Sequence, residues 1–372
     1  MNRNLKISNL VLILLGLKVL YYTSTISYYS IIDQILLVCG CALGAVYIIV
    51  YYRMSLKTCF IIGIVSTILL ISSVISKNAS LMISWLTIII IKDKPINEFI
   101  KLSFFMKVLF IITHLLYSLL IFFINPNSLL IQYSDGIRLS FFTSHPNVFS
   151  SIVMWTVMEW LWLKFDKIKF KDIITFIIIT ILTYACTKTD ATIFICLIFI
   201  ALFVMYKCGY CNILCKISKW IMPFLMMITF GMVNLFNTTS INMLKIISFL
   251  DKVLSRRISA SAYAKSIYNY TMFGQVMDLS SIGWSDTYQL SGIILDNLYI
   301  SVAFRIGIII LILISISFYK LSNLNKGQLS IFIIMFCVYG LIETQGLIIY
   351  YCFTLSFIKY LLNNKMIDEI LK

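Results

Sequence analysis

Side chains able to bind phosphate or move a proton recur where apolar stretches of this chain begin or end. They are Arg138, His145, Asn147, Arg256, Arg257 and Asp296. Guanidinium groups bind phosphate oxygens bidentately, and histidine and aspartate are able to accept a proton from a reacting hydroxyl group. These residue types predict a substrate that carries phosphate.

The segment His145-Pro146-Asn147 runs directly into an apolar stretch. Pro146 biases His145 toward an extended backbone, and Asn147 is a residue type that caps helices. We therefore expect His145 at the mouth of a helix. Two interpretations stay open at this point: His145 is a site residue, or Pro146 and Asn147 only start the helix and His145 lies at the membrane interface.

The second arginine position lies in a long polar stretch. Apolar residues recur there at helical spacing, namely Ile241, Leu244, Ile247, Leu250, Leu254 and Ile258. This spacing predicts an amphipathic helix over 240–260 on the outer surface, with Arg257 at the edge of its apolar face. Arg257 would then point to the depth of lipid phosphates. The alternative, which the local sequence by itself favours, is that Arg256 and Arg257 only extend to lipid headgroups.

Charged residues inside or beside apolar stretches indicate polar cavities or pairs. A charge near the centre of a bilayer costs roughly 2.5–3.5 kcal/mol on insertion scales, so Asp296, Arg305 and Glu343 are expected to face a polar cavity. For Lys18, Lys107 and Glu159 we expect pairing among the charged residues of the spans instead. Further candidates for the site are Lys188, in a turn, and Asn297 and Tyr299. Tyr299 would either stack on a sugar or belong to an aromatic belt at the membrane interface.

The composition defines the elements that must position these residues. Of 372 residues, 61% are apolar and 12% are charged, which excludes a soluble enzyme. Apolar stretches of membrane-spanning length predict an all-α polytopic membrane protein with about twelve spans, eleven being the alternative count. The expected spans are 7–22, 31–52, 58–76, 79–91, 102–124, 147–163, 173–186, 189–206, 217–236, 297–318, 328–343 and 345–362.

Loop charges predict the orientation. Most Lys and Arg of the connecting segments fall on the side of the N-terminus, so both termini are expected in the cytoplasm. Residues 1–372 then form a single transmembrane domain, with a long extracytoplasmic loop over 237–296. The net charge of +15 does not by itself indicate a nucleic acid partner, and none is expected. Cys208, Cys211 and Cys215 lack a fourth ligand for zinc, and we expect neither a metal nor a cofactor.

In order and spacing, these motifs resemble the bacterial polysaccharide polymerases of the Wzy type, relatives of the O-antigen ligases. The matching segments are Gly136-Ile137-Arg138-Leu139-Ser140-Phe141, His145-Pro146-Asn147, Leu254-Ser255-Arg256-Arg257-Ile258, Phe273-Gly274, Asp296-Asn297-Leu298-Tyr299, Gly307 and Glu343. Two departures exist. Ser255-Arg256 stands where a Thr-Gly pair is common, and Thr189-Asp190 stands where Ser-Arg is common. The second departure removes a cation, so either Lys188 replaces it or this position does not contact the substrate.

The resemblance implies a GT-C-like glycosyltransferase in the bacterial plasma (inner) membrane. Such an enzyme joins undecaprenyl-diphosphate-linked oligosaccharide repeat units into surface polysaccharide, such as O-antigen, capsule or exopolysaccharide. Arg138 and Arg257 would hold the diphosphate, with Arg256 beside them, and His145 or Asp296 would act as general base, with His145 preferred. Expected partners are the lipid bilayer, a chain-length regulator and a flippase.

Two other functions stay open. One is an O-antigen ligase-like transferase, which uses the same donor chemistry with a different acceptor. The other is a flippase for the same lipid-linked oligosaccharides, which also has about twelve spans and basic cavity residues. Transporters usually contain internal repeats, whereas polarity in this chain is concentrated in one long loop. This difference ranks the polymerase first, the ligase second and the transporter third.

Overall fold

A computed structural model describes residues 3–51, 54–125, 130–133, 136–236, 241–254, 256–277, 295–324 and 326–363. The chain is an all-α membrane protein, about 80% helical. Among the described residues, seven helices are long and apolar enough to cross a membrane. The chain forms two compact units. Unit 1 comprises Met1–Ile62, Ile83–Ile200 and Ile348–Lys372, and unit 2 comprises Gly63–Met82 and Ala201–Leu347.

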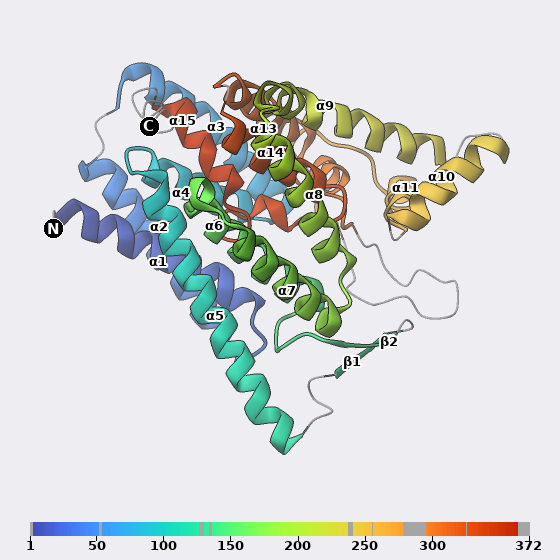
Figure 1. Cartoon of the computed structure of the whole chain (residues 1–372). Helices are drawn as coiled ribbons and strands as arrows, with labels where there is room; N and C mark the ends of the chain where they lie inside the picture. Colours follow the sequence, from blue (N-terminus) through green and yellow to red (C-terminus); the bar gives the residue numbers. More distant parts are fainter. Residues whose placement is uncertain are drawn as a thin grey trace. The chain divides into compact units, whose positions relative to one another are not determined.

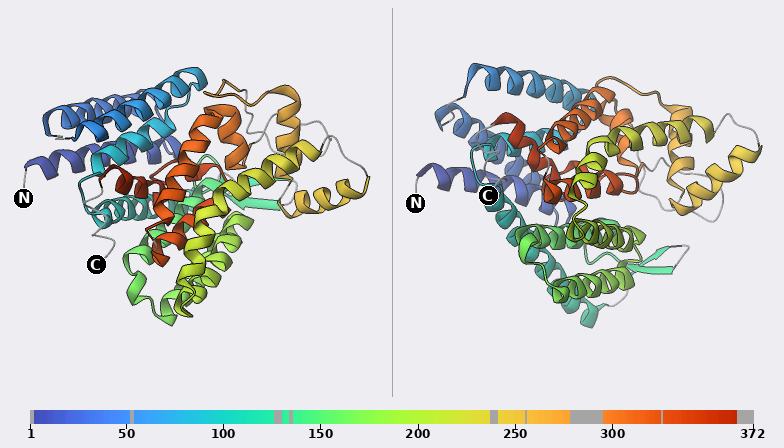
Figure 2. Two further views of the ribbon diagram at one scale, coloured as in Figure 1. Left: turned by 90° about the horizontal axis from the view of Figure 1, so that it is seen from above. Right: turned by 45° about the horizontal axis from the view of Figure 1, so that its top comes forward.

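Long helices of almost uninterrupted apolar sequence make up most of unit 1 (Figure 1). They are α1 (Arg3–Thr23), α2 (Ser30–Tyr51), α5 (Ile96–Ile124), α6 (Pro146–Leu163) and α7 (Phe170–Thr187), with α3 (Leu56–Ser76), α4 (Ser80–Ile91) and α8 (Asp190–Lys207) continuing into or from unit 2. Helices α1 and α2 pack side by side, as both views in Figure 2 show. Helix α6 packs between α5 and α7.

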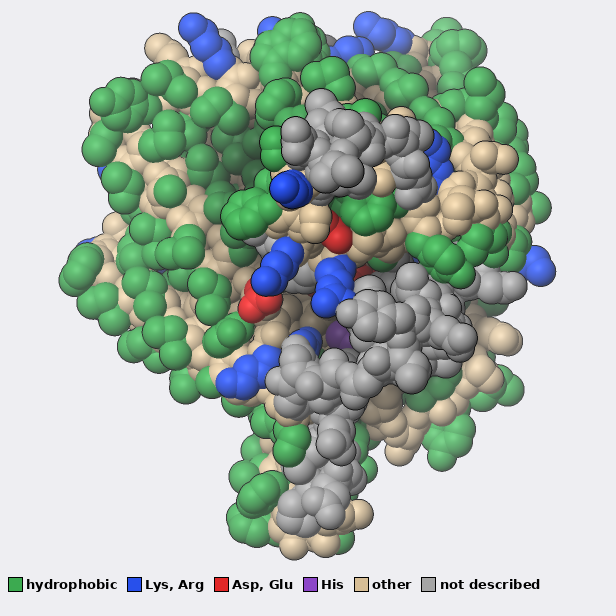
Figure 3. Space-filling model, turned by 90° about the vertical axis from the view of Figure 1, so that its right-hand side faces the viewer, with side chains coloured by type: hydrophobic (Ala, Val, Ile, Leu, Met, Phe, Trp, Pro, Cys, Tyr) green, Lys and Arg blue, Asp and Glu red, His purple; other side chains and the backbone are tan. Residues whose placement is uncertain are grey.

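Many large apolar side chains of these helices point outward. Ile49 is 80% exposed, and hydrophobic side chains cover much of the face drawn in Figure 3. A soluble protein rarely exposes continuous apolar surface on this scale, because water contact with it is unfavourable. This surface is therefore suited to contact with lipid.

The expected pairing of Lys107 with Glu159 is present in unit 1, whereas Lys18 pairs with Asp33, a residue that we had not considered. Lys107 on α5 and Glu159 on α6 are 1% and 0% exposed, with Nζ and Oε1 2.7 Å apart. Ser103 Oγ also donates to Glu159 Oε1, and Lys107 Nζ donates to the carbonyl of Tyr351. Lys18 pairs with Asp33 at 3.5 Å. The Lys107–Glu159 pair thereby joins α5, α6 and the chain around residue 351.

A short antiparallel hairpin follows α5 in unit 1. Strand β1 (Leu130–Tyr133) pairs with β2 (Gly136–Leu139), with Ile131 opposite Arg138 in the register. Strand β2 lies against α7. The hairpin leads directly into the turn that starts α6.

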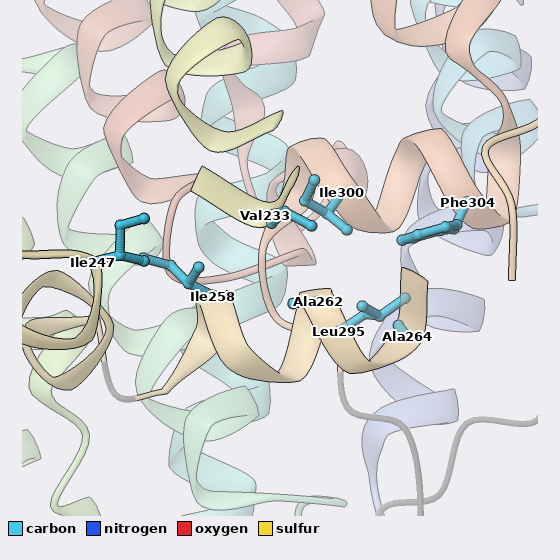
Figure 4. Packing of buried hydrophobic residues seen from close by; sticks show 8 residues of the cluster. All are labelled: Val233, Ile247, Ile258, Ala262, Ala264, Leu295, Ile300 and Phe304. Carbon is cyan, nitrogen blue, oxygen red and sulfur yellow. The ribbon is translucent and has the colours of Figure 1, made fainter. Parts of the chain in front are cut away.

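Unit 2 is built around α9 (Cys211–Phe236). Helices α13 (Ile308–Ser322), α14 (Gly327–Tyr339) and α11 (Arg257–Ile267) pack against it. Figure 4 shows the apolar cluster that joins α11 to its neighbours. It consists of Val233, Ile247, Ile258, Ala262, Ala264, Leu295, Ile300 and Phe304.

The single amphipathic helix expected over 240–260 is two helices. Helix α10 (Ile241–Val253) ends before Arg256, whose left-handed backbone (φ 62°) separates it from α11. The Asp251 carboxylate accepts hydrogen bonds from the backbone N–H groups of Ile258 and Ser259, at 2.8 and 3.0 Å. It thereby satisfies donors that a helix start leaves open. Helical spacing alone did not reveal the break, because Leu254 and Ile258 keep the period across it.

The span expected over 297–318 is interrupted. Helix α12 (Leu298–Ser301) passes into a π-helical turn, η3 (Val302–Ile306), and Gly307 adopts φ 119° before α13 begins. A Cβ atom at Gly307 would lie 2.2 Å from the carbonyl oxygen of Met272, so only glycine allows this approach. Segment 271–276 and Ser72, whose Oγ donates to the Ile306 carbonyl at 2.5 Å, bind the backbone groups of the break.

The last expected span, 345–362, also lacks one continuous helix. It contains the short helical turns η4 (Gln345–Leu347), η5 (Phe353–Ile358) and α15 (Lys359–Leu362). Irregular backbone at membrane depth is tolerated where protein surrounds it, and the side chains of Phe353, Phe357 and Lys359 are buried. In contrast, each expected span from 7–22 to 217–236 contains one helix.

Candidate functional site

The turn that delivers the chain to α6 is strained and tightly held. Phe141 and Phe142 both have left-handed backbones, with φ 51° and 57°, which is rare for bulky residues. The end of α1 holds this turn, because Thr25 N–H donates to the Phe142 carbonyl at 2.8 Å and Ser144 N–H donates to the Thr23 carbonyl at 2.9 Å. The ring of Phe141 lies 4.4 Å from that of Phe149 on α6. This strained turn fixes the backbone immediately before His145.

His145 itself caps α6. Its Nδ1 accepts a hydrogen bond from the backbone N–H of Asn147 at 3.1 Å, and Pro146 occupies the first helical position. The expectation that Asn147 caps the helix is wrong, because Asn147 lies inside the first turn. With the Nδ1 lone pair used in this way, the neutral ring carries its proton on Nε2. In this state neither ring nitrogen of His145 has a lone pair left to act as a base.

Asn147 contacts the turn between α7 and α8. Thr189 Oγ1 lies 3.2 Å from Asn147 Oδ1 and donates to it, and the Thr189 side chain is buried. Lys188 ends α7 with a left-handed backbone and is exposed, with its Nζ 5.7 Å from the Tyr184 ring centroid. Thr189 was named in the sequence only as a departure from a family motif, so its tie to Asn147 was missed. Its type and position gave no local signal of that contact.

An apolar groove begins near the residues that start α6 and end α7, and it follows α6. It has a volume of about 580 Å³ and lies between α5, α6 and α7. Its lining residues are almost all apolar, and Phe141, Phe149 and Cys186 line it next to the residues that start α6 and end α7. Toward its other end it is lined by Phe104, Thr156 and Trp160. A groove of this size lies within the range of about 300–1,000 Å³ that is typical of small-molecule sites.

Arg138 lies on β2, in the same unit as His145. Its side chain is half-buried, and its backbone is held in register with Ile131 by the hairpin. Because β2 lies against α7, the hairpin attaches Arg138 to the helix that ends at Lys188. Unit 1 therefore contains Arg138, His145, Asn147 and Lys188 among the sequence-predicted site residues.

In unit 2 the structure brings Arg257, Asp296 and Glu343 together. Nη2 of Arg257 lies 3.4 Å from Glu343 Oε1 and 3.8 Å from Asp296 Oδ2. Nη1 donates to the Leu254 carbonyl at 3.3 Å, and Nε is buried without a hydrogen-bond partner among the described residues. We call these three side chains the Arg257 cluster. One guanidinium group therefore lies against two carboxyl groups.

The backbone around the Arg257 cluster is fixed from both sides. The Asp251 carboxylate caps α11 by accepting a hydrogen bond from the N–H of Ile258, the residue after Arg257. Arg256 is exposed at the start of this helix, and its backbone N–H donates to the Asp251 carbonyl at 2.7 Å. Asn297 caps α12 through Oδ1 and donates from Nδ2 to the Leu341 carbonyl at 3.1 Å. This second bond ties the segment of Asp296 to that of Glu343. Asp251 was not among the predicted site residues, because a cap seven residues away in sequence follows no short motif.

Two sequence-based roles need correction in this light. Tyr299 is fully buried, and its hydroxyl donates to the Cys337 carbonyl at 2.6 Å, so its ring is not open to a sugar. Asn297 is buried and both ends of its amide are used by the backbone. Tyr299 and Asn297 therefore anchor α12 and position Asp296 instead of binding substrate.

The candidate residues thus form two groups, one in each unit. In the part of the chain that the structure describes, no group of three or more His, Cys, Asp or Glu side chains is arranged to hold a metal ion. No family model, curated protein or solved structure matches this chain.

Proposed function

We propose that the chain is a polymerase of undecaprenyl-diphosphate-linked oligosaccharide repeat units, acting on the outer side of the bacterial plasma membrane. A GT-C-like arrangement with twelve membrane crossings and cytoplasmic termini is part of this proposal. The observation that carries it is the apolar groove along α6 with polar side chains at one end. Such a site suits a lipid with a polar head.

The dimensions of the groove support a single lipid chain entering from one leaflet. From Phe149 to Trp160 an α-helix rises roughly 16 Å. This is about half of the roughly 30 Å hydrocarbon core of a bilayer. A chain lying along this length would place its head near His145, Asn147 and Lys188. The aromatic rings of Phe104, Phe149 and Trp160 would contact the methyl branches of a prenyl chain.

The proposal also gives the arginines a role in binding the diphosphate. A diphosphate leaving group gains negative charge as its bond to the sugar breaks, and fixed cations stabilise that charge in the transition state. Arg257 has an Nε donor without a hydrogen-bond partner among the described residues, and Arg138 is held on a short hairpin. We assign Arg257, with Arg256 beside it, to the diphosphate. We propose that Arg138 and Lys188 also bind phosphate oxygens.

The proposed transfer balances without a cofactor. The bond between the anomeric carbon of the donor chain and its diphosphate oxygen breaks, and the acceptor hydroxyl oxygen forms the new bond to that carbon. The hydroxyl proton passes to a base, and undecaprenyl diphosphate leaves. Because Nδ1 of His145 is used by the helix cap, the exposed carboxylate of Asp296 is the better base, and His145 would donate a hydrogen bond from Nε2.

The test uses purified full-length protein in detergent with a defined lipid-linked repeat unit. We expect a ladder of lipid-linked oligomers, which Arg257→Ala should abolish while the protein stays monodisperse. Lys252→Ala is the matched control, because Lys252 is an exposed cation on α10 outside the cluster, and this variant should keep the ladder. Without a ladder from the wild-type protein under these conditions, the polymerase assignment fails.

The same experiment separates the alternatives. A flippase moves its substrate across a membrane, and detergent solution contains no membrane to cross, so ladder formation excludes simple transport. A ligase would transfer the oligosaccharide to another acceptor instead of to a second lipid-linked unit. Single-unit transfer to an added glycolipid acceptor, with no ladder, would favour the ligase.

A further inference from the structure

The Arg257 cluster has one carboxylate more than its guanidinium can neutralise. Both acidic partners approach the same nitrogen, Nη2, at distances of 3.4 and 3.8 Å. Charge-assisted N–H···O bonds are usually about 2.7–2.9 Å long. Arg257 is therefore held in place without being saturated, and its buried Nε has no hydrogen-bond partner among the described residues.

The two carboxylates differ in how easily they can be replaced. The Glu343 side chain is 3% exposed, whereas that of Asp296 is 37% exposed and lies farther from Arg257. Separating a buried ion pair leaves an uncompensated charge in the protein and is costly, but a pair that water reaches contributes little. A ligand that competes for Arg257 will therefore displace Asp296 and leave Glu343 in contact.

The surrounding backbone restricts this exchange to side chains. Asp251 fixes the start of α11, and the Asn297 amide ties the backbone at residue 341 to the start of α12. The guanidinium, Asp296 and Glu343 thus project from anchored backbone. Only the Asp296 side chain has both the exposure and the weaker contact needed to swing away.

We propose that Asp296 is a displaceable internal counter-ion of Arg257, and that an incoming diphosphate takes its place on the guanidinium. This inference rests on the proposed function and deepens it, because it couples the two roles assigned to the cluster. Diphosphate binding at Arg257 releases the Asp296 carboxylate, which then becomes available as the base for the acceptor hydroxyl. Without the donor bound, the carboxylate stays engaged and the acceptor is not activated.

The consequence is opposite to that of removing an ordinary binding residue. Asp296→Asn should bind inorganic diphosphate about 1.4- to fivefold more tightly than the wild type, since the competing pair is worth about 0.2–1 kcal/mol and 1.4 kcal/mol is tenfold. Transfer of lipid-linked units by the same variant should slow, because the amide is no base. Tighter binding with slower transfer distinguishes the exchange from structural damage.

The test measures by calorimetry the affinity for inorganic diphosphate of four purified proteins. They are the wild type, Asp296→Asn, Arg257→Ala and the double variant Asp296→Asn/Arg257→Ala. The gain from Asp296→Asn should vanish when Arg257 is absent. Asp166→Asn is the matched control for a lost negative charge, since Asp166 is an exposed residue just after α6 and lies outside the cluster, and it should leave the affinity unchanged.

Three results would overturn the inference. Unchanged or weaker binding by Asp296→Asn would show that Asp296 does not compete for Arg257. An equal gain with and without Arg257 would indicate a general field effect. In both cases, the proposed function would keep its support if the single variant Arg257→Ala lost diphosphate binding. Absence of diphosphate binding by wild type and Asp296→Asn would overturn both the exchange and the assignment of Arg257.

Discussion

The buried pair between Lys107 and Glu159 gives the most quantitative prediction about the fold. The two side chains are 1% and 0% exposed, with charged atoms 2.7 Å apart, and Glu159 Oε2 has no hydrogen-bond partner among the described residues. Removing one partner leaves the other charge buried, which costs about 3–5 kcal/mol. We therefore expect Lys107→Met and Glu159→Leu each to reduce the free energy of unfolding by about this amount.

Replacing both residues should cost much less than either single change. A pair of buried charges exchanged for apolar side chains of similar volume is often neutral or stabilising. The double variant Lys107→Met/Glu159→Leu should therefore be closer to wild type than either single variant. The assay is unfolding in mixed detergent–SDS micelles, followed by tryptophan fluorescence, because Trp155 and Trp162 pack against Phe353 in the same unit. Small, additive losses in the two single variants would show that the two buried charges do not depend on each other.

Three further predictions concern the break in unit 2, a buried lysine and the helix cap. Gly307→Ala should abolish folding, because the added Cβ atom would meet the Met272 carbonyl. Gly231→Ala is the control, since Gly231 lies in open space on α9, and it should be neutral or stabilising by about 0.5–1 kcal/mol. Equal thermal stability of the two variants would contradict this prediction. Burial lowers the pKa of Lys94 to about 8 from 10.5, against an opposing effect of Glu98. The unfolded state therefore binds more protons between these values, and thermal stability should rise over pH 8–10.5 in the wild type but not in Lys94→Met. His145→Asn keeps a capping acceptor, so this variant should retain its stability and make measurable polymer. His145→Ala should lose about 1 kcal/mol of unfolding free energy. A stable His145→Asn protein that makes no product would indicate that His145 is the base.

The sequence predicted the helices that are defined by their own residues. Spans such as 102–124 and 147–163 are continuous apolar stretches, and α5 and α6 form there because lipid leaves an isolated backbone no other way to pair its polar groups. Pairing of Lys107 and Glu159 was also predictable, since a charge at that depth needs a partner. The helices depend on no contact distant in sequence, and the pairing needed only the depth of each charge, although the two residues lie on different helices.

What the sequence did not reveal depends on such contacts. The residues of η3 read as one apolar stretch with α13, and the break exists because segment 271–276 and Ser72 supply partners for the opened backbone. Gly274 and Gly307 were the only local signal. Likewise, the burial of Tyr299 follows from its hydroxyl meeting the Cys337 carbonyl, 38 residues away. A pattern of aspartate, asparagine and tyrosine does not distinguish an anchor from a sugar-binding surface.

We propose that Arg257 binds the lipid diphosphate, and an electron cryomicroscopy structure of the full chain with undecaprenyl diphosphate in lipid nanodiscs would test this binding. We expect the Arg257 guanidinium group within about 2.7–3.2 Å of phosphate oxygens, with Asp296 turned away from it and Glu343 still in contact. A bound diphosphate that does not contact Arg257, with Asp296 still paired to it, would contradict the proposal.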